Sequence, residues 1–274
     1  MPSNRDILGE LRVEPGSPPR LRQRDPGARF GAADKPSGHE RLERLVQRLG
    51  VLHNRLAAEA TRALLLVLQG MDASGKDGTI RHVLTGVNPQ GCRVVSFGEP
   101  TSSELAHDYL WRVHAACPAR GEVAIFNRSH YEDVVAVRVR DLEPESIWRR
   151  RYGQIRSFER LLVEEGTTVV KVFLHVSEAV QGRRLQERLD DPEKRWKFRA
   201  SDLEDRRRLA EYTTAYEDAL RETSTEWAPW YVVPADHKWV RNLAVGAILV
   251  ENLERLDPRL PAPDPRLDGL EVSS

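Results

Sequence analysis

The chain contains an apolar run that leads directly into a glycine-rich loop. The run is ALLLVLQ at 63–69, and the loop is GMDASGKDGT at 70–79. A Gly-x4-Gly-Lys spacing between an apolar strand and a helix is typical of a phosphate-binding loop (P-loop). The backbone N–H groups and the helix N-terminus attract a phosphate, and the lysine adds a mobile positive charge. We therefore predict phosphate binding by these loop residues: Gly70, Ala73, Ser74, Gly75, Lys76, Asp77 and Gly78.

The same loop carries two carboxylates, which would repel a phosphate unless a cation offset their charge. Asp77 stands where P-loop enzymes usually have the Ser or Thr that ligates magnesium. Asp72 lies inside the loop. Carboxylate oxygens are ligands of the kind that Mg²⁺ prefers, so the loop is suited to hold a magnesium ion that offsets this charge. Asp77 fits two roles equally well, as a metal ligand and as a first-turn acid stabilised by the helix dipole.

Four more short apolar runs follow, separated by stretches of helical length. Runs without strict alternation indicate strands covered on both faces, and helical connections indicate parallel crossovers. The sequence therefore predicts an α/β fold with a doubly wound, parallel, five-stranded sheet. The four further strands are expected at 92–97, 122–127, 168–176 and 230–234.

The spacing of apolar residues also predicts the helices and the domain organisation. Six of the 17 prolines lie in residues 1–38, which we interpret as an extended arm, followed by one domain at 39–256 and a Pro-rich, acidic tail at 257–274. Ser201 is expected to cap a helix that carries Leu209, Tyr212, Tyr216 and Leu220 on one side. Other helices are expected at 39–62, 104–116 and 146–165.

Composition narrows the possible classes of protein. The 42 Lys and Arg residues balance 42 Asp and Glu residues, which excludes a uniformly basic nucleic-acid binder. No apolar run is long enough to span a membrane, and the two cysteines form no close pair. We expect a cytoplasmic protein with no nucleic-acid or membrane partner. Within the arm, residues 20–35 hold five cations and two acids, which suits a solvated arm and an arm that reaches an anionic ligand equally well.

A second group of polar residues, NRSHYED at 127–133, follows the third predicted strand. The carboxyl ends of strands in a doubly wound sheet line the ligand crevice, so this group should meet the P-loop. Arg128 is placed to neutralise charge on a transferred phosphoryl group. Asn127 and Glu132 suit two roles equally well. They could orient an acceptor or metal-bound water, or they could belong to an ordinary strand end followed by a capped helix. For His130 we favour a structural role.

Two further segments are candidates for substrate contacts. Residues 178–208 follow the fourth strand, where P-loop kinases have a lid, and KRWKFR at 194–199 contains four cations and no acid. Tyr109, Trp111 and Arg112 lie in the region that binds the acceptor in nucleoside monophosphate kinases, an assignment by fold analogy alone.

Six motifs in order resemble the polyphosphate kinase 2 family, over residues 20–253. They are GMDASGKDGTIRHV, GVNPQGC, HDYLWR, FNRSHYEDV, DPEKRWKF and APWYVVPADHKW. The resemblance implies a P-loop kinase core with a helical lid. It also implies Mg²⁺, inorganic polyphosphate and a nucleotide as ligands, and a homo-oligomer, either a dimer or a tetramer.

The resemblance also assigns roles to individual residues. It implies that Asp72 binds the metal, that Lys76 binds phosphate and that Arg128 is the arginine of the second motif. With Asn127 in its FNRSHYE motif, the chain resembles the single-domain group of the family, whose members accept AMP and often ADP. Adenine is the expected base. One departure is Leu209-Ala210, where many relatives have Trp-Asp. The resemblance places the basic lid at these cations: Arg183, Arg184, Arg188, Lys194, Lys197 and Arg199.

Our hypothesis is reversible, Mg²⁺-dependent transfer of the terminal phosphoryl group of polyphosphate to a nucleotide. The mechanism would be in-line displacement without a covalent enzyme intermediate. Positioning and charge neutralisation suffice for such a step, since an acceptor phosphate needs no strong base. The alternatives are a nucleoside monophosphate kinase that uses ATP and a non-catalytic protein that binds polyphosphate or nucleotide.

Overall fold

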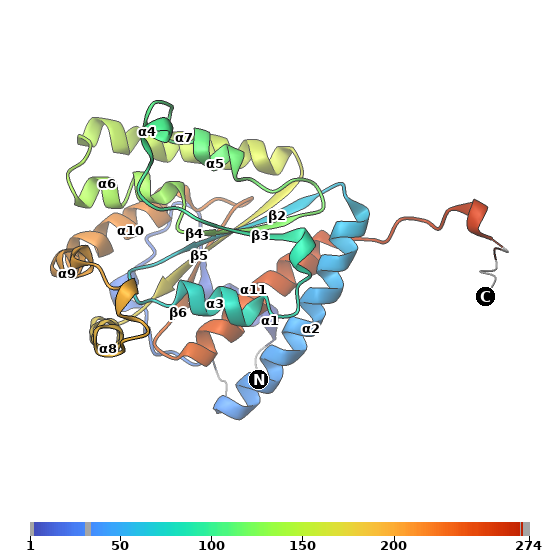
Figure 1. The fold of residues 1–274 in the computed structure, drawn as a ribbon, viewed down its shortest axis with the longest axis horizontal. Coiled ribbons are helices and arrows are strands. Elements are labelled where there is room, and N and C mark those ends of the chain that lie inside the picture. Colours follow the sequence, from blue (N-terminus) through green and yellow to red (C-terminus); the bar gives the residue numbers. More distant parts are fainter. Residues whose placement is uncertain (1–2, 31–33, 269, 271–274) are drawn as a thin grey trace.

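The computed structural model describes residues 3–30, 34–268 and 270 of the chain. The protein is a three-layered α/β structure with helices on both faces of one sheet (Figure 1). Its strands are β1 (Arg12–Val13), β2 (Ala63–Gln69), β3 (Cys92–Ser96), β4 (Val123–Asn127), β5 (Thr167–His175) and β6 (Trp230–Pro234). Its α-helices are α1 (Asn4–Leu11), α2 (Lys35–Glu59), α3 (Lys76–Val83), α4 (Ser102–Leu105), α5 (Trp111–Ala115), α6 (Ala136–Val139), α7 (Glu145–Glu164), α8 (Glu178–Asp190), α9 (Ala200–Arg207), α10 (Leu209–Thr223) and α11 (Lys238–Leu256).

The strand order is β1-β6-β5-β2-β4-β3, and every pair is parallel except β1 with β6. The P-loop strand β2 therefore lies in the interior of the sheet between β4 and β5. In β2 the alternate residues Leu64, Leu66 and Leu68 belong to one hydrophobic core, and Leu65 and Val67 belong to the other. Both faces of β2 are buried, which explains its continuous apolar sequence.

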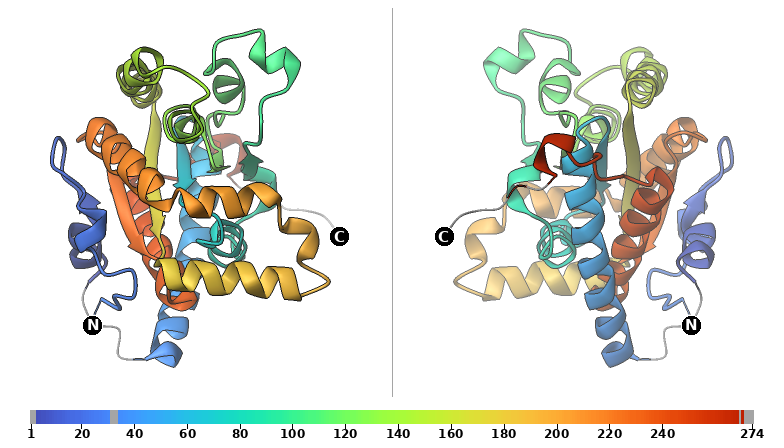
Figure 2. Two further views of the ribbon diagram at one scale, coloured as in Figure 1. Left: turned by 90° about the vertical axis from the view of Figure 1, so that its left-hand side faces the viewer. Right: turned by 90° about the vertical axis from the view of Figure 1, so that its right-hand side faces the viewer.

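The two cores lie on opposite faces of the sheet. Helices α1, α2, α3 and α11 cover one face, and α5, α7 and α10 cover the other (Figure 1). Helices α8 and α9 form a hairpin that projects beside α3, as the left view of Figure 2 shows. No helix in the described ranges is long and apolar enough to cross a membrane.

The prediction of a parallel α/β sheet is confirmed, but the number of strands was wrong. The five predicted strands are present, and β1 adds a sixth, antiparallel strand at the edge. This strand comes from the predicted extended arm, which also contains α1. The arm is docked on the domain, because Leu21 N–H donates to Glu217 Oε1 (2.8 Å) and Ser224 Oγ donates to Val13 O (2.6 Å).

The predicted segment boundaries differ from the elements at both ends of the domain. Helix α2 begins at Lys35 after the cap residue Asp34, four residues before the predicted boundary at 39. After α11 the chain runs away from the body of the domain (Figure 1). Residues 1–2 and 31–33 of the predicted arm, and 269 and 271–274 of the predicted tail, lie outside the described residues.

Two of the predicted helices are interrupted in the structure. The stretch 104–116 contains α4 and α5 with a non-helical link between them. The helix expected to begin at Ser201 begins at Ala200, after Arg199, and the chain breaks at Arg208 into α9 and α10. Tyr212, Tyr216 and Leu220 are buried on one side of α10, as predicted.

Candidate active site

The P-loop joins β2 to α3 at the edge of the sheet where the parallel strands end. Gly70 has a φ of +146°, and a Cβ at this position would lie 2.8 Å from the carbonyl oxygen of Leu174 on β5. The close approach of β5 and the unusual backbone angle therefore both require glycine here. Ala73, inside the loop, also has a positive φ, of 60°. The loop thus has the tightly curved backbone that phosphate binding requires.

Lys76 is buried and folds back over its own loop. Its Nζ donates hydrogen bonds to the carbonyl oxygens of Gly70 (2.6 Å) and Met71 (3.3 Å). Burial and the nearby charge of Arg128 lower the pKa of Lys76 to about 8, although Asp72 and Glu132 oppose this shift. A phosphate beside Nζ would favour the charged ammonium, so binding an anion relieves an unfavourable environment.

Asp72 and Arg128 form an ion pair that connects the P-loop to the end of β4. Arg128 Nη2 donates to Asp72 Oδ1 at 2.6 Å. Burial alone would raise the pKa of Asp72, but Lys76 and Arg128 together hold it below its ordinary value. Burial opposes the charge of Arg128, yet Glu132 and Asp72 keep its pKa above the ordinary value. Arg128 also has a left-handed backbone, with φ at 62°, which is strained for a residue with a side chain.

Asn127 contacts the first turn of α3. Its Nδ2 donates to Asp77 Oδ1 at 2.8 Å, and Lys197 Nζ lies 3.8 Å from Asp77 Oδ2. Asp77 therefore joins the end of β4 to the predicted lid, and this ionic contact explains how its negative charge is compensated beside a phosphate site. The two roles considered for Asp77, metal ligand and first-turn acid, both remain predictions.

The predicted lid cations occupy different environments. Arg188 is half-buried on α8, and its positive charge contributes to the lowered pKa of Asp72. Arg183 is exposed, 3.8 Å from Glu187, and Lys194 is exposed and paired with Asp191. Arg184 is buried and binds backbone carbonyls of the P-loop. The exposed Arg199 precedes α9, and its N–H donates to Asp202 Oδ2 (3.3 Å).

The predicted acceptor residues lie on and before α5. Arg112 Nη1 donates to Gly98 O (3.0 Å). The guanidinium of Arg151 lies over the ring of Tyr109, with its Cζ 4.7 Å from the ring centre. Trp111 is 45% exposed, and one face of its indole stacks on the ring of His107, with 4.2 Å between the ring centres. Glu132 is half-buried and acts electrostatically on Lys76 and Arg128, whereas the ring of His130 is buried with Nε2 3.4 Å from Glu159 Oε1.

The sequence did not identify two residues that the structure brings to the P-loop. Asp202 on α9 is buried, and its pKa is raised by burial and by the charge of Asp72, so the lid presents a carboxylate toward the loop. Arg241 on α11 is 3% exposed, and its Nη1 donates to Ser74 O at 3.3 Å. Asp202 lay within a predicted helix cap, but its approach to Asp72 depends on how the lid folds back.

A third unpredicted feature is the buried carboxylate of Asp133. Its Oδ2 accepts no hydrogen bond from the described residues, and its Oδ1 lies 3.9 Å from Arg151 Nη1. Burial raises the pKa of Asp133 to about 6, although Arg151 and Arg112 oppose the shift. The folded protein therefore binds this proton more tightly than the unfolded chain, whose aspartates titrate near pH 4.

The Asp133→Asn variant should differ from the wild type in how its stability depends on pH. Because the folded pKa is raised, the wild type loses free energy of unfolding between about pH 4 and pH 6 as this carboxyl ionises. The variant lacks that loss. Its free energy of unfolding, relative to that of the wild type, should therefore rise by up to about 3 kcal/mol between pH 4 and pH 6. Urea denaturation at pH 4, 5, 6 and 7 measures the difference, and parallel curves for the two proteins would contradict it.

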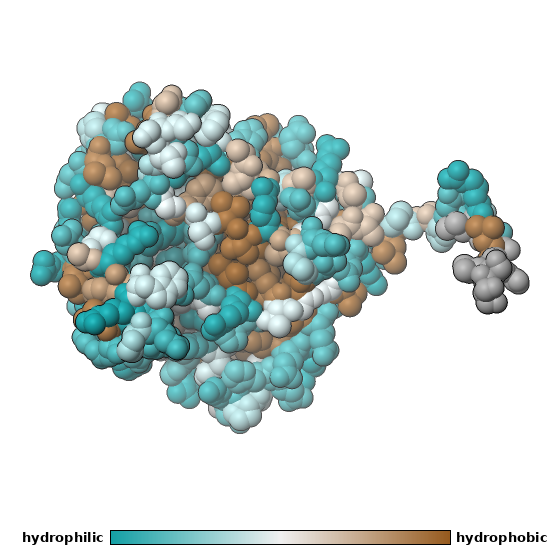
Figure 3. Space-filling model, in the orientation of Figure 1, coloured by the Kyte–Doolittle hydropathy of each residue, from teal (hydrophilic) through white to brown (hydrophobic). Residues whose placement is uncertain are grey.

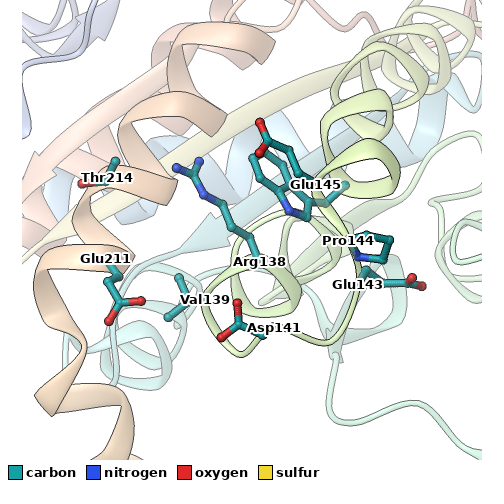
Figure 4. A pocket seen from close by; sticks show the side chains of 9 residues that line it. Arg138, Val139, Asp141, Glu143, Pro144, Glu145, Glu211 and Thr214 are labelled. Carbon is teal, nitrogen blue, oxygen red and sulfur yellow. The ribbon is translucent and has the colours of Figure 1, made fainter.

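A cavity of about 660 Å³ lies between α6, α7 and α10. Its charged lining side chains are mainly acidic, whereas cations surround the P-loop. Figure 4 shows the carboxylates of Asp141, Glu143, Glu145 and Glu211 around this cavity, with Arg138 as the cation among its lining residues. Four carboxylates and one cation line this cavity, so it suits a phosphate less well than the P-loop does, even though arginines pair with these carboxylates. The candidate active site is therefore the P-loop and its neighbours.

The residues at the P-loop fit a magnesium ion that is held mostly by its substrate. The described residues contain no group of three or more His, Cys, Asp or Glu side chains that could hold a metal. Asp72 binds Arg128 through Oδ1, and its Oδ2 accepts no hydrogen bond from the described residues. Mg²⁺ is commonly held by one or two carboxylates together with substrate phosphates and water, which is what this site offers.

Comparisons with known proteins agree with this geometry. The chain is 56% identical over 258 residues to a Meiothermus ruber protein named AMP/ADP-polyphosphate phosphotransferase, covering 94% of this chain and 97% of that protein. It is 46% identical to an ADP-polyphosphate phosphotransferase of Rhodopseudomonas palustris, covering 83% of each. The crystal structure of Polyphosphate Kinase 2 from Arthrobacter aurescens TC1 superimposes with a TM-score of 0.90 at 41% identity, covering 96% of this chain and 93% of that one.

The family model described as Polyphosphate kinase 2 (PPK2) matches residues 32–261, which include the P-loop, the NRSHYED segment and the lid. The match spans most of the chain, and the Meiothermus and Arthrobacter proteins are similar to it over nearly their whole lengths. Sequence, fold and site geometry therefore agree, and the chain belongs to the polyphosphate kinase 2 family.

Proposed function

We propose that this protein transfers the terminal phosphoryl group of inorganic polyphosphate to AMP, to ADP or to both, in a reversible reaction. The observation that carries the proposal is the ion pair between Asp72 and Arg128, 2.6 Å long, beside the buried ammonium of Lys76. It brings two cations and one carboxylate to the end of the P-loop strand. This is the set of charges that phosphoryl transfer between anions requires.

Lys76 and Arg128 neutralise the phosphates during transfer. Lys76 releases the carbonyls of its own loop and turns its ammonium to a phosphate oxygen. Only Nη2 of Arg128 donates to Asp72, so the other N–H groups of the guanidinium can donate to the transferred phosphoryl group. The acceptor is already an anionic phosphate, so no general base is needed, and a phosphoanhydride replaces a phosphoanhydride. Catalysis consists of positioning and charge neutralisation.

Magnesium supplies charge neutralisation between neighbouring phosphates when it is bound. We assign Asp72 as its protein ligand, through the carboxylate oxygen that Arg128 leaves free. Arg128 meanwhile fixes the orientation of that carboxylate. Asp202 of the lid caps α9 by accepting from the Arg199 N–H, and it interacts electrostatically with Asp72.

The lid cations and the acceptor region complete the proposed site. Lys197 links the lid to Asp77 on α3, and the charge of Arg188 on α8 acts on Asp72, so both are suited to ordering a chain of phosphates. We assign Trp111 and Arg112 to nucleotide binding: Trp111 is 45% exposed, and Arg112 would exchange its contacts with Gly98 O and Glu104 for the nucleotide. The name of the Meiothermus relative includes both AMP and ADP, which supports a protein that accepts either nucleotide.

Product analysis with the purified protein tests the proposal. With Mg²⁺ and polyphosphate, we expect AMP to yield ADP and then ATP, and ADP to yield ATP, as separated by ion-exchange chromatography. Omitting Mg²⁺ and adding EDTA should remove the product. Formation of ADP from ATP and AMP without polyphosphate would indicate an ordinary monophosphate kinase. Binding of polyphosphate without product from either acceptor would refute the enzymatic proposal.

A further inference from the structure

Two buried arginines lie behind the P-loop without a carboxylate partner. Arg184 on α8 is 8% exposed, and Arg241 on α11 is 3% exposed. Neither lies within 4.0 Å of a carboxylate oxygen of the described residues. Burial and the neighbouring charge of Arg184 lower the pKa of Arg241 to about 10. Buried arginines are usually paired with carboxylates, because removing their charge from water is costly. Two buried arginines without carboxylate partners, close together, therefore indicate a functional role.

Arg184 binds the carbonyls of two segments at once. Its Nη1 donates to Ala73 O (3.1 Å) and Ser74 O (3.2 Å), both in the P-loop. Its Nη2 donates to Ala235 O (2.7 Å) and Asp236 O (2.8 Å), where the chain leaves β6. One planar guanidinium therefore fixes the distance between the P-loop and the neighbouring strand end, which a lysine could not reproduce.

Arg241 approaches the same carbonyl group from α11. Its Nη1 donates to Ser74 O (3.3 Å), while Nε and Nη2 both donate to Asn242 Oδ1 (3.2 and 2.9 Å). The contact is so close that a Cβ on Gly75 would lie 1.8 Å from Arg241 Nη1. Asn242 thus holds the guanidinium against the loop, and the glycine of the P-loop motif makes room for it.

These contacts determine where the loop N–H groups point. The described chain has no cis peptide bond, so the carbonyl and the N–H of each peptide point in opposite directions. Ser74 O faces the two arginines, and the N–H of Gly75, in the same peptide unit, therefore faces the opposite side of the loop. The N–H of Ser74 is already used, because it donates to Met71 O (3.1 Å) and closes the turn.

We propose that Arg184 and Arg241 are positioning residues for the phosphate site: they hold the P-loop carbonyls outward, so that the Gly75 N–H faces the phosphate. They also place two positive charges behind a site that receives a polyanion, without touching that ligand. The inference rests on the proposed function of the P-loop. It gives Arg184 a different role from the phosphate contact that the sequence suggested.

Lysine and methionine substitutions at both positions separate geometry from charge. Arg184→Lys and Arg241→Lys keep the charge but lose the fork of donors, and we expect kcat to fall about tenfold to a hundredfold while both KM values change less. Arg184→Met and Arg241→Met also lose the charge, and their kcat should fall further. The matched control is Arg44→Met, which removes an exposed arginine paired with Glu40 on α2.

Amide hydrogen exchange with tripolyphosphate gives a readout that a merely structural role would not change. In the wild type, tripolyphosphate should protect the Gly75 N–H, and this protection should be reduced in the folded lysine variants. If a methionine variant does not fold, the lysine variants carry the test. Lysine variants with wild-type kcat and wild-type protection would overturn the proposal. If the wild type makes no product, the proposed function fails, while the exchange measurement still decides the positioning role.

Discussion

The Lys76→Ala variant is expected to lose phosphoryl transfer by about a hundredfold to a thousandfold, the range found when one donor to a developing charge is removed. Lys76 is the cation that the P-loop itself supplies, and its Nζ lies within hydrogen-bond distance of the Gly70 carbonyl at the start of the loop. The measurement is the rate of ADP formation from AMP, polyphosphate and Mg²⁺ at saturating substrate. Arg44→Ala, which removes an exposed cation on α2, serves as the control for a change in net charge.

The same variant should remain folded. Burial lowers the pKa of Lys76, which means that the folded protein disfavours its charge relative to water. Removing the ammonium therefore relieves an unfavourable burial and leaves two loop carbonyls to water. Circular dichroism and thermal denaturation should resemble those of the wild type. Turnover at the wild-type rate in a folded Lys76→Ala protein would refute the assignment of this loop as the phosphate site.

For Arg128→Ala we expect a larger loss, about a thousandfold or more, because arginines that neutralise a transferred phosphoryl group commonly contribute that much. The variant also deprives Asp72 of its partner at 2.6 Å, so the carboxylate loses both its orientation and part of its charge compensation. The measurement is kcat at several Mg²⁺ concentrations. Excess Mg²⁺ should recover little activity, since it does not replace the guanidinium.

The backbone strain at Arg128 does not complicate this comparison. Alanine also carries a Cβ, so it meets the left-handed φ of 62° with a strain similar to that of arginine. Arg128→Lys keeps the charge and tests the need for two donors, and we expect an activity between those of Arg128→Ala and the wild type. Equal activity in Arg128→Ala and the wild type would show that the ion pair with Asp72 serves the structure alone.

The sequence was sufficient to predict the sheet core and the approach of the P-loop to the NRSHYED segment. Both predictions depend on simple regularities: buried parallel strands are continuously apolar, and the carboxyl ends of neighbouring strands meet. The contacts from Asp72 to Arg128 and from Asp77 to Asn127 follow from the position of β4 beside β2.

The sequence did not predict the structure of the arm. The strand β1 has two residues, too few to show a period, and it lies close to a Pro-rich stretch. The apolar residues Ile7, Leu8 and Leu11 have helical spacing after the cap residue Ser3, and this was a usable signal for α1. The break at Arg208 has no such signal, because α9 and α10 together form one continuous helical pattern in the sequence.

The contacts of individual charged side chains were the least predictable part of the site. Arg183 and Arg184 are adjacent in the sequence, yet one is exposed and the other is buried against the P-loop. Which of them faces inward depends on how α8 is rotated against the P-loop and the segment that follows β6. The predicted oligomeric state also stays a prediction.

The pairing of β1 with β6 protects one edge of the sheet. Without β1, the N–H and C=O groups of Tyr231 and its neighbours would be available to the strands of another molecule. At the opposite edge, β3 pairs with β4 alone among the described strands, and its Val94 is 46% exposed. Figure 3 shows an apolar area on this face of the molecule. Among the described residues the two-residue β1 pairs with the start of β6 and leaves only a short edge of its own, so the five-residue β3 presents the longer edge to another molecule.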